Sequence, residues 1–215
     1  MADPAFEPLT PDRRRRQTKE HLLEAAAQVL SERGYHGATL DEVAAKAGFT
    51  KGAVYSNFKN KEDLFLALLD SMREKEMERL HQTIEASEVP PEARLGDFVA
   101  FMREPPMPST WSWIALYLEF CLYAFRNDAA RDRLIELQES SIDSVAEILE
   151  TERARSGIET DESPRQLARI VEAFTRGLSI MRELDPDSVD QEFLEVALSV
   201  LARALNPGGD SQKPT

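Results

Sequence analysis

The segment Thr39–Phe58 constrains the fold of this 215-residue chain more than any other. Thr39 and Glu42 have the Ser/Thr-x-x-Glu spacing of a capping box, and apolar residues at helical spacing follow them. Gly48 ends this first short helix, and Thr50 can cap a second one directly after it. Two short helices joined by such a turn form a helix-turn-helix.

The second short helix separates an apolar face from a polar one. Ala53, Val54 and Phe58 can face a core, whereas the remaining side chains stay outside. The outward residues supply hydrogen-bond donors that suit the base edges and phosphates of a major groove. They are Lys51, Tyr55, Ser56 and Asn57.

The run from Gly48 to Leu64 closely resembles the signature of TetR-family transcriptional regulators. The resemblance covers roughly residues 18 to 69, which correspond to the family's DNA-binding headpiece, and the rest of the chain resembles the family in its helical layout. The residue before Phe58 is often His in this family and is Asn57 here.

This resemblance implies that the protein binds double-stranded, palindromic operator DNA. The family uses the positions of Lys51, Tyr55 and Lys59 for phosphate or base-edge contacts, and Thr39 meets another phosphate at its helix N-terminus. Tyr55 could instead pack at the headpiece surface. The expected DNA-binding residues are Arg15, Arg16, Thr39, Thr50, Lys51, Gly52, Ala53, Tyr55, Ser56, Asn57 and Lys59.

Four consecutive arginines, Arg13 to Arg16, precede the headpiece. Residues 1–17 are predicted to form a flexible basic arm that follows phosphates or enters the minor groove. The alternative is a solvated charged tail. We favour DNA contact, because runs of like charge next to a DNA-binding unit are often nucleic-acid arms.

Apolar residues recur at helical spacing along the whole chain, in segments separated by Gly and Pro residues. Segments with the alternating pattern of a strand are nearly absent, so the sequence predicts an all-α fold. The first helix should end at Gly34, and a helix through Leu95, Phe98 and Met102 should lie between proline-rich breaks. Other helices are expected over about 60–86, 111–126, 129–155, 163–184 and 189–205.

Three functional parts follow the arm. Residues 18–63 are expected to form the helix-turn-helix DNA-binding domain, residues 64–205 an effector-binding and dimerisation domain, and residues 206–215 a disordered tail. Net charge is −13, yet residues 1–63 hold equal numbers of acidic and basic side chains. An acidic body favours docking on DNA through the basic end alone, although solubility explains the acidity equally well.

The stretch Trp111–Arg126 is apolar on every face of a helix, so it should be buried on all sides. In a TetR-like body such a helix lines the effector cavity, which implies a small hydrophobic or aromatic effector. Each residue taken singly is more often ordinary core. The candidate pocket residues are Phe98, Phe101, Met102, Trp113, Tyr117, Glu119, Phe120, Cys121, Phe174, Leu178 and Met181.

Glu119 is the one acid inside that apolar helix. A buried, unpaired carboxylate is costly, so it needs a cation, a donor network or a proton. It could anchor the effector. An internal ion pair with Arg126, Arg169 or Arg176 is the favoured alternative, because buried charges are normally paired.

The last two helices resemble a dimer surface. One carries an apolar stripe and the other is apolar nearly all round, so the last helix must be covered on two sides. A homodimer with an intermolecular four-helix bundle would provide this cover, whereas a monomer would need a centrally packed helix. The expected interface residues are Leu167, Ile170, Phe174, Phe193, Val196, Ala197, Val200 and Leu201.

Other classes of function find little support. The single cysteine, Cys121, and the unclustered histidines suggest neither a disulfide nor a metal site, and no cofactor is expected. No phosphate loop or catalytic triad is evident, so an enzyme is not expected. The most apolar stretch is too short to span a membrane, and the N-terminus lacks a signal sequence, which predicts a cytoplasmic protein.

Overall fold

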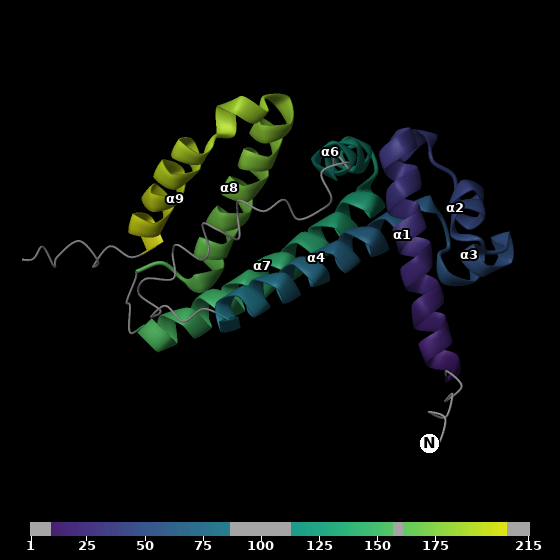
Figure 1. The fold of residues 1–215 in the computed structure, drawn as a ribbon, viewed down its shortest axis with the longest axis horizontal. Helices are drawn as coiled ribbons and strands as arrows, with labels where there is room; N and C mark the ends of the chain where they lie inside the picture. The colour runs from purple at the N-terminus through teal and green to yellow at the C-terminus, as the bar shows by residue number, and fades with distance from the viewer. Residues whose placement is uncertain (1–9, 87–112, 157–160, 206–215) are drawn as a thin grey trace, which may run out of the picture. The chain divides into compact units, whose positions relative to one another are not determined.

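The computed structural model describes residues 10–86, 113–156 and 161–205, with side chains throughout except at positions 113, 156, 191, 198 and 201–205. Within these ranges the chain forms helices and no strand, which confirms the all-α fold (Figure 1). The chain divides into two compact units, Met1–Asp70 and Ser71–Thr215. No helix of the described ranges has both the length and the apolarity to cross a bilayer.

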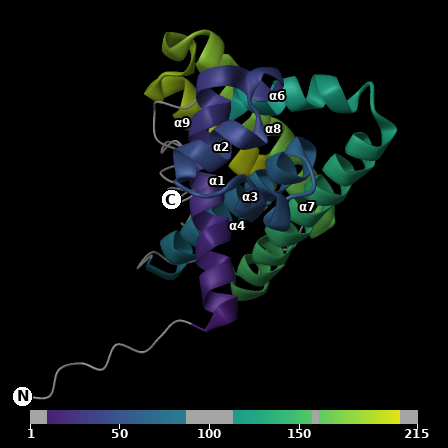
Figure 2. The ribbon, with the colours of Figure 1, turned by 90° about the vertical axis from the view of Figure 1, so that its right-hand side faces the viewer.

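The first unit contains α1 (Pro11–Gly37), α2 (Leu40–Ala47), α3 (Lys51–Asn57) and the beginning of α4 (Lys61–Ala86). α2 and α3 lie against one side of α1 (Figures 1 and 2). Every helix contributes to a shared apolar core, as the helical spacing of the sequence predicts. The fully buried members include Leu22, Leu30, Val43, Val54, Phe58, Leu64 and Phe65.

The N-terminal end of α1 differs from the sequence prediction. The helix already begins at Pro11, so the arginines predicted to lie in a flexible arm occupy its first turns. Thr10 caps this helix, because its hydroxyl oxygen accepts a hydrogen bond of 3.3 Å from the amide of Arg13. At the other end Gly34 takes a left-handed φ of 70°, which breaks the helix at the expected position.

The second unit contains the rest of α4, α6 (Trp113–Ala124), α7 (Asp128–Ser156), α8 (Pro164–Leu184), a 3₁₀ turn η2 (Pro186–Val189) and α9 (Gln191–Leu205). Its main core joins α7, α8, η2 and α9. The buried members are Ile142, Val145, Ala168, Val171, Leu178, Val189 and Leu194. The expected helix through Leu95 lies outside the described residues, as does the expected tail over 206–215.

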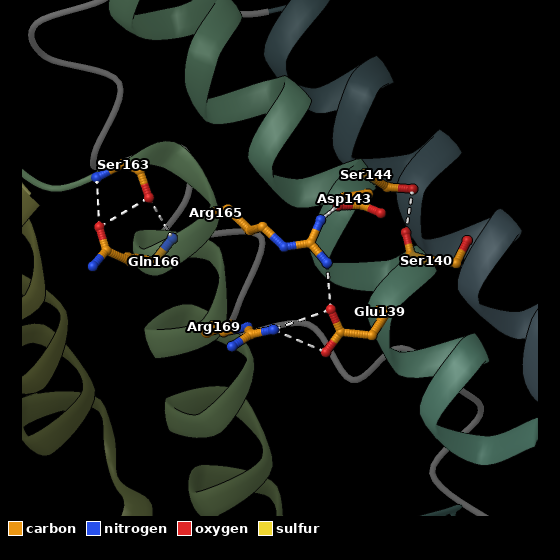
Figure 3. A network of polar contacts seen from close by, with 8 residues as sticks. All are labelled: Glu139, Ser140, Asp143, Ser144, Ser163, Arg165, Gln166 and Arg169. Atoms are coloured by element: carbon orange, nitrogen blue, oxygen red, sulfur yellow. Dashed lines mark hydrogen bonds and ion pairs between the residues drawn. The ribbon is translucent and has the colours of Figure 1, made fainter. Parts of the chain in front are cut away.

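A polar network joins the exposed sides of α7 and α8 (Figure 3). Arg165 donates hydrogen bonds to Asp143 and Glu139, and Arg169 donates two more to the Glu139 carboxylate at 3.0 and 3.1 Å. These guanidinium groups hold the pKa of Glu139 below its usual range. The Ser163 capping box starts α8 beside this network, so this helix begins where the sequence predicts it.

α6 departs from the expectation of burial on every face. Phe120 is fully buried and Leu116 is 5% exposed, yet Leu122 and Phe125 are 58% and 71% exposed. Within the described residues α6 packs against α7 and α8, while Leu122 remains accessible. An apolar helix can therefore combine one buried stripe with exposed apolar residues.

Candidate functional sites

α2 is fixed at both ends by the residues that the sequence singled out. The Glu42 amide donates to the Thr39 hydroxyl oxygen at 3.2 Å, and the Thr39 amide donates to the Glu42 carboxylate at 3.0 Å. This is a complete capping box. At the far end Gly48 takes a left-handed φ of 71°, and its amide donates to the carbonyl of Ala45 at 3.2 Å. The predicted helix-turn-helix is confirmed.

α3 presents one face to the core and one to solvent. Val54 is fully buried and Phe58 is 2% exposed. Tyr55, on the opposite side, is 56% exposed, so its ring does not pack into the headpiece. Lys51, at the first position of α3, is also exposed. The phenol and the ammonium group therefore lie where a DNA groove could meet them.

Four of the expected DNA-binding side chains are already engaged within the headpiece. The hydroxyls of Thr39 and Thr50 serve as helix caps. Ser56 and Asn57 both donate to the carbonyl oxygen of Ala53, at 2.9 and 2.8 Å. These contacts shape α2 and α3, and they leave fewer free donors on α3 than its sequence suggests.

Lys51 has an acidic partner that the sequence analysis missed. Its ammonium group forms an ion pair with the carboxylate of Asp41, in the first turn of α2. The hydrogen bond that Lys51 donates to Asp41 within this ion pair raises the pKa of Lys51 above its usual value. The sequence gives little sign of this ion pair. The two residues are ten positions apart, and they meet only because the turn brings α2 and α3 together.

The second unit contains a polar group among its helices. The Tyr117 hydroxyl, on α6, accepts a hydrogen bond from Nε2 of Gln138 on α7, and the Cys121 thiol lies near this hydroxyl, one turn further along α6. The guanidinium carbon of Arg176, on α8, lies 5.1 Å from the centroid of the Tyr117 ring. Burial raises the pKa of Tyr117 to about 12 and raises that of Cys121 as well.

Exposed apolar side chains follow α8 and α9, whose buried residues share one core (Figure 1). On α8, Ile170, Met181 and Leu184 are 49%, 41% and 81% exposed. On α9, Val196 and Val200 are 57% and 53% exposed. Large apolar residues gathered on two neighbouring helices are typical of an interaction surface.

Comparison with known families decides the assignment. The model for bacterial regulatory proteins of the tetR family matches residues 22–68. The model for the C-terminal domain of BetI-type transcriptional repressors matches residues 91–206, more than half of the chain. The chain belongs to the TetR family. It is therefore a DNA-binding transcriptional regulator, as the helix-turn-helix implied.

Individual relatives align along three quarters or more of the chain. The transcriptional repressor DhaR of Mycobacterium sp. strain GP1 is 24% identical over 204 residues, which cover 92% of this chain and 96% of DhaR. The repressor AcnR of Corynebacterium diphtheriae is 28% identical over 75% of this chain and 80% of its own. A transcriptional regulator from Rhodococcus sp. Rha1 superposes with a TM-score of 0.68 at 25% identity, covering 91% and 99% of the two chains.

The residues expected to line an effector pocket do not all lie together in this TetR-family chain. Tyr117 and Cys121 share the polar group just described, and Phe120 is buried on the same helix. Phe174 and Leu178 pack instead in the core formed by α7, α8 and α9. Met181 is exposed. Phe98, Phe101 and Met102 lie outside the described residues, and Trp113 is described only as the first residue of α6.

The expectation for Glu119 rested on burial, and the structure corrects it. Glu119 is partly exposed, so it is not the fully buried acid that the sequence indicated. Two of the arginines considered as partners pair elsewhere. Arg169 pairs with Glu139, and Arg176 pairs with Glu172 at 3.0 Å.

The residues expected at a TetR-family dimer interface divide into two groups. Leu167 is buried within its own subunit, and Phe174 packs against the same internal core. The other side chains that the structure describes are at least partly accessible, whereas that of Leu201 is not described. The accessible set is Ile170, Phe193, Val196, Ala197 and Val200.

Proposed function

We propose that this TetR-family protein binds a palindromic operator as a homodimer, represses transcription there, and is released by a small hydrophobic or aromatic effector. The observation that carries the DNA-binding part is the two-sided α3 helix. Val54 and Phe58 anchor it in the headpiece, while Lys51 and Tyr55 point to solvent. We assign DNA binding to residues 18–63, and effector binding and dimerisation to residues 64–205.

In this proposal α3 enters the major groove. Lys51 and Lys59 contact phosphates, and Tyr55 meets a phosphate or a base edge. Gly52 and Ala53 allow the groove to approach the helix backbone closely, since among the described side chains a Cβ atom at Gly52 would meet only the Thr50 hydroxyl, at 3.8 Å. Arg15 and Arg16 act from the first turns of α1 and not from a flexible arm.

Dimerisation is assigned to α8 and α9. The exposed apolar residues of these helices would be covered by the same residues of a second subunit, as in an isologous interface. Apart from the helix's own backbone, no atom of the described residues lies within 4 Å of a Cβ atom placed at Gly177, so α8 is open to close approach there. Two headpieces related by the dimer axis would read half-sites about one helical turn, or a multiple of it, apart.

The effector is assigned to the neighbourhood of α6. Tyr117 offers an aromatic side chain on the same helix as the buried Phe120, and Gln138 and Arg176 offer polar groups on two other helices. An apolar wall with a few polar groups is typical of small-molecule sites. The effector releases DNA only by as much as it prefers the released conformation, typically about 1–3 kcal/mol.

Selection of genomic fragments tests this function. The purified protein is incubated with fragmented genomic DNA and an excess of competitor DNA, and the retained fragments are sequenced. We expect a palindromic sequence to be enriched by the wild type and lost in Tyr55→Ala. Equal recovery of all fragments would contradict sequence-specific binding.

A further inference from the structure

The two lysines assigned to phosphate contacts differ in their surroundings. The Lys51 ammonium is paired with the Asp41 carboxylate, and both side chains remain accessible, at 70% and 46%. The Lys59 side chain is exposed and makes no ion pair with the described part of the chain. Lys59 can thus meet a phosphate directly, whereas Lys51 must first leave a carboxylate.

The position of Asp41 adds to this competition. It lies in the first turn of α2 and faces the first residue of α3, so it stays beside Lys51 when α3 enters a groove. A carboxylate left there would repel the DNA backbone. Exposed ion pairs are weak, so the contact can be exchanged without unfolding the headpiece.

We propose that Asp41 is an internal competitor for the phosphate that Lys51 contacts, and that it lowers the affinity of the headpiece for DNA of any sequence. The inference rests on the proposed DNA-binding role of α3. Competition by Asp41 would weaken the binding to DNA that phosphate contacts alone provide. Contacts with the base edges would then contribute more to the choice of site. The raised pKa of Lys51 agrees with a specific, hydrogen-bonded pair.

The test measures the affinity of the full-length protein for a 30-base-pair duplex of arbitrary sequence, by fluorescence anisotropy at low salt. We expect Asp41→Asn to tighten binding about three- to tenfold, the range that one exposed ion pair per subunit allows. Asp41→Ser, which also removes the charge, should give the same gain. Both variants should retain the wild-type melting temperature to within a few degrees.

Two controls separate competition from a general change of charge. Glu32→Gln removes one acid from the ion pair with Lys46, which lies 3.3 Å away in the last turn of α2, and should tighten binding less. In a Lys51→Ala background, Asp41→Asn should add less than it does when Lys51 is present, because only the repulsion of the DNA backbone is then removed. An equal gain in both backgrounds, or no gain at all, would overturn the competitor role.

The outcome also distinguishes this inference from the proposed function. Suppose that Lys51→Ala weakens DNA binding but Asp41→Asn does not strengthen it. Then α3 binds DNA, and the ion pair of Asp41 with Lys51 only connects α2 to α3. If Lys51→Ala binds like the wild type and the wild type selects no genomic sequence, the assigned interface itself is wrong.

Discussion

Arg176 lies over the ring of Tyr117, with its guanidinium carbon 5.1 Å from the ring centroid. The hydroxyl of the same tyrosine accepts a hydrogen bond from Gln138. One side chain of α6 is therefore held by residues of both α7 and α8. A shift of α6 would change all of these contacts together, which makes this tyrosine a sensitive position in the second unit.

The first prediction concerns pH. Burial raises the pKa of Tyr117 from 10.0 to about 12, so the folded state favours the neutral phenol. The resulting stabilisation is complete below about pH 10 and is lost as pH rises through 12. Tyr117→Phe should therefore lose less unfolding free energy than the wild type between pH 9 and 12, as measured by urea denaturation. Equal losses in both proteins would contradict a buried, neutral phenol.

A second prediction concerns the turn between α2 and α3. Gly48 has a φ of 71°, which an alanine adopts only at a cost of about 1–2 kcal/mol. Gly48→Ala should lower the unfolding free energy by about that amount, although the added methyl would meet no neighbouring group of the described residues within 4 Å. Chemical denaturation provides the measurement. An unchanged stability would mean that the turn relaxes at no cost.

Gly52→Ala provides a matched contrast and a third prediction. This glycine lies in α3 with ordinary helical geometry, so alanine should maintain or raise stability, by up to about 1 kcal/mol. The same methyl would project toward DNA in the proposed complex. We expect operator affinity to fall about tenfold, the effect of modest overpacking. A variant with full affinity would place the groove away from Gly52.

Much of the fold could be predicted because its signals are local. Caps at Thr39, Thr50 and Ser163 act through hydrogen bonds within three residues, and each begins a helix where the sequence predicts one. The prediction of a flexible arm over residues 1–17 was wrong, because α1 already begins at Pro11. Arginines in a first turn oppose the helix dipole, but the cap at Thr10 and the proline after it are themselves signals of a helix start.

The less predictable features depend on contacts between distant residues. The Asp41 partner of Lys51 and the Gln138 partner of Tyr117 appear only when helices come together. Exposure of Leu122 also depends on which elements cover α6, and hydrophobicity alone does not show this. The apolar pattern indicates what can be buried, and the packing of neighbouring helices decides what is.

The fourth prediction tests the dimer. Val196 is 57% exposed on α9, so Val196→Arg should leave the fold of one subunit intact. In a dimer it would bury an unpaired charge in each subunit, which costs several kcal/mol, and the dissociation constant should rise at least about 100-fold. Ile135→Arg, at a comparably exposed position on α7, is the control and should remain dimeric. Sedimentation velocity distinguishes the two, and a dimer in both variants would exclude α9 from the interface.

The salt dependence of operator binding tests the proposed DNA interface most directly. A plot of log affinity against log salt concentration for the selected operator should have a slope that becomes shallower by about two per dimer in Lys59→Ala, because each phosphate contact contributes about 0.9. Lys75→Ala, which removes an exposed lysine of α4 outside the headpiece, should retain the wild-type slope. A Lys59→Ala protein with the wild-type slope and affinity would contradict the proposed interface.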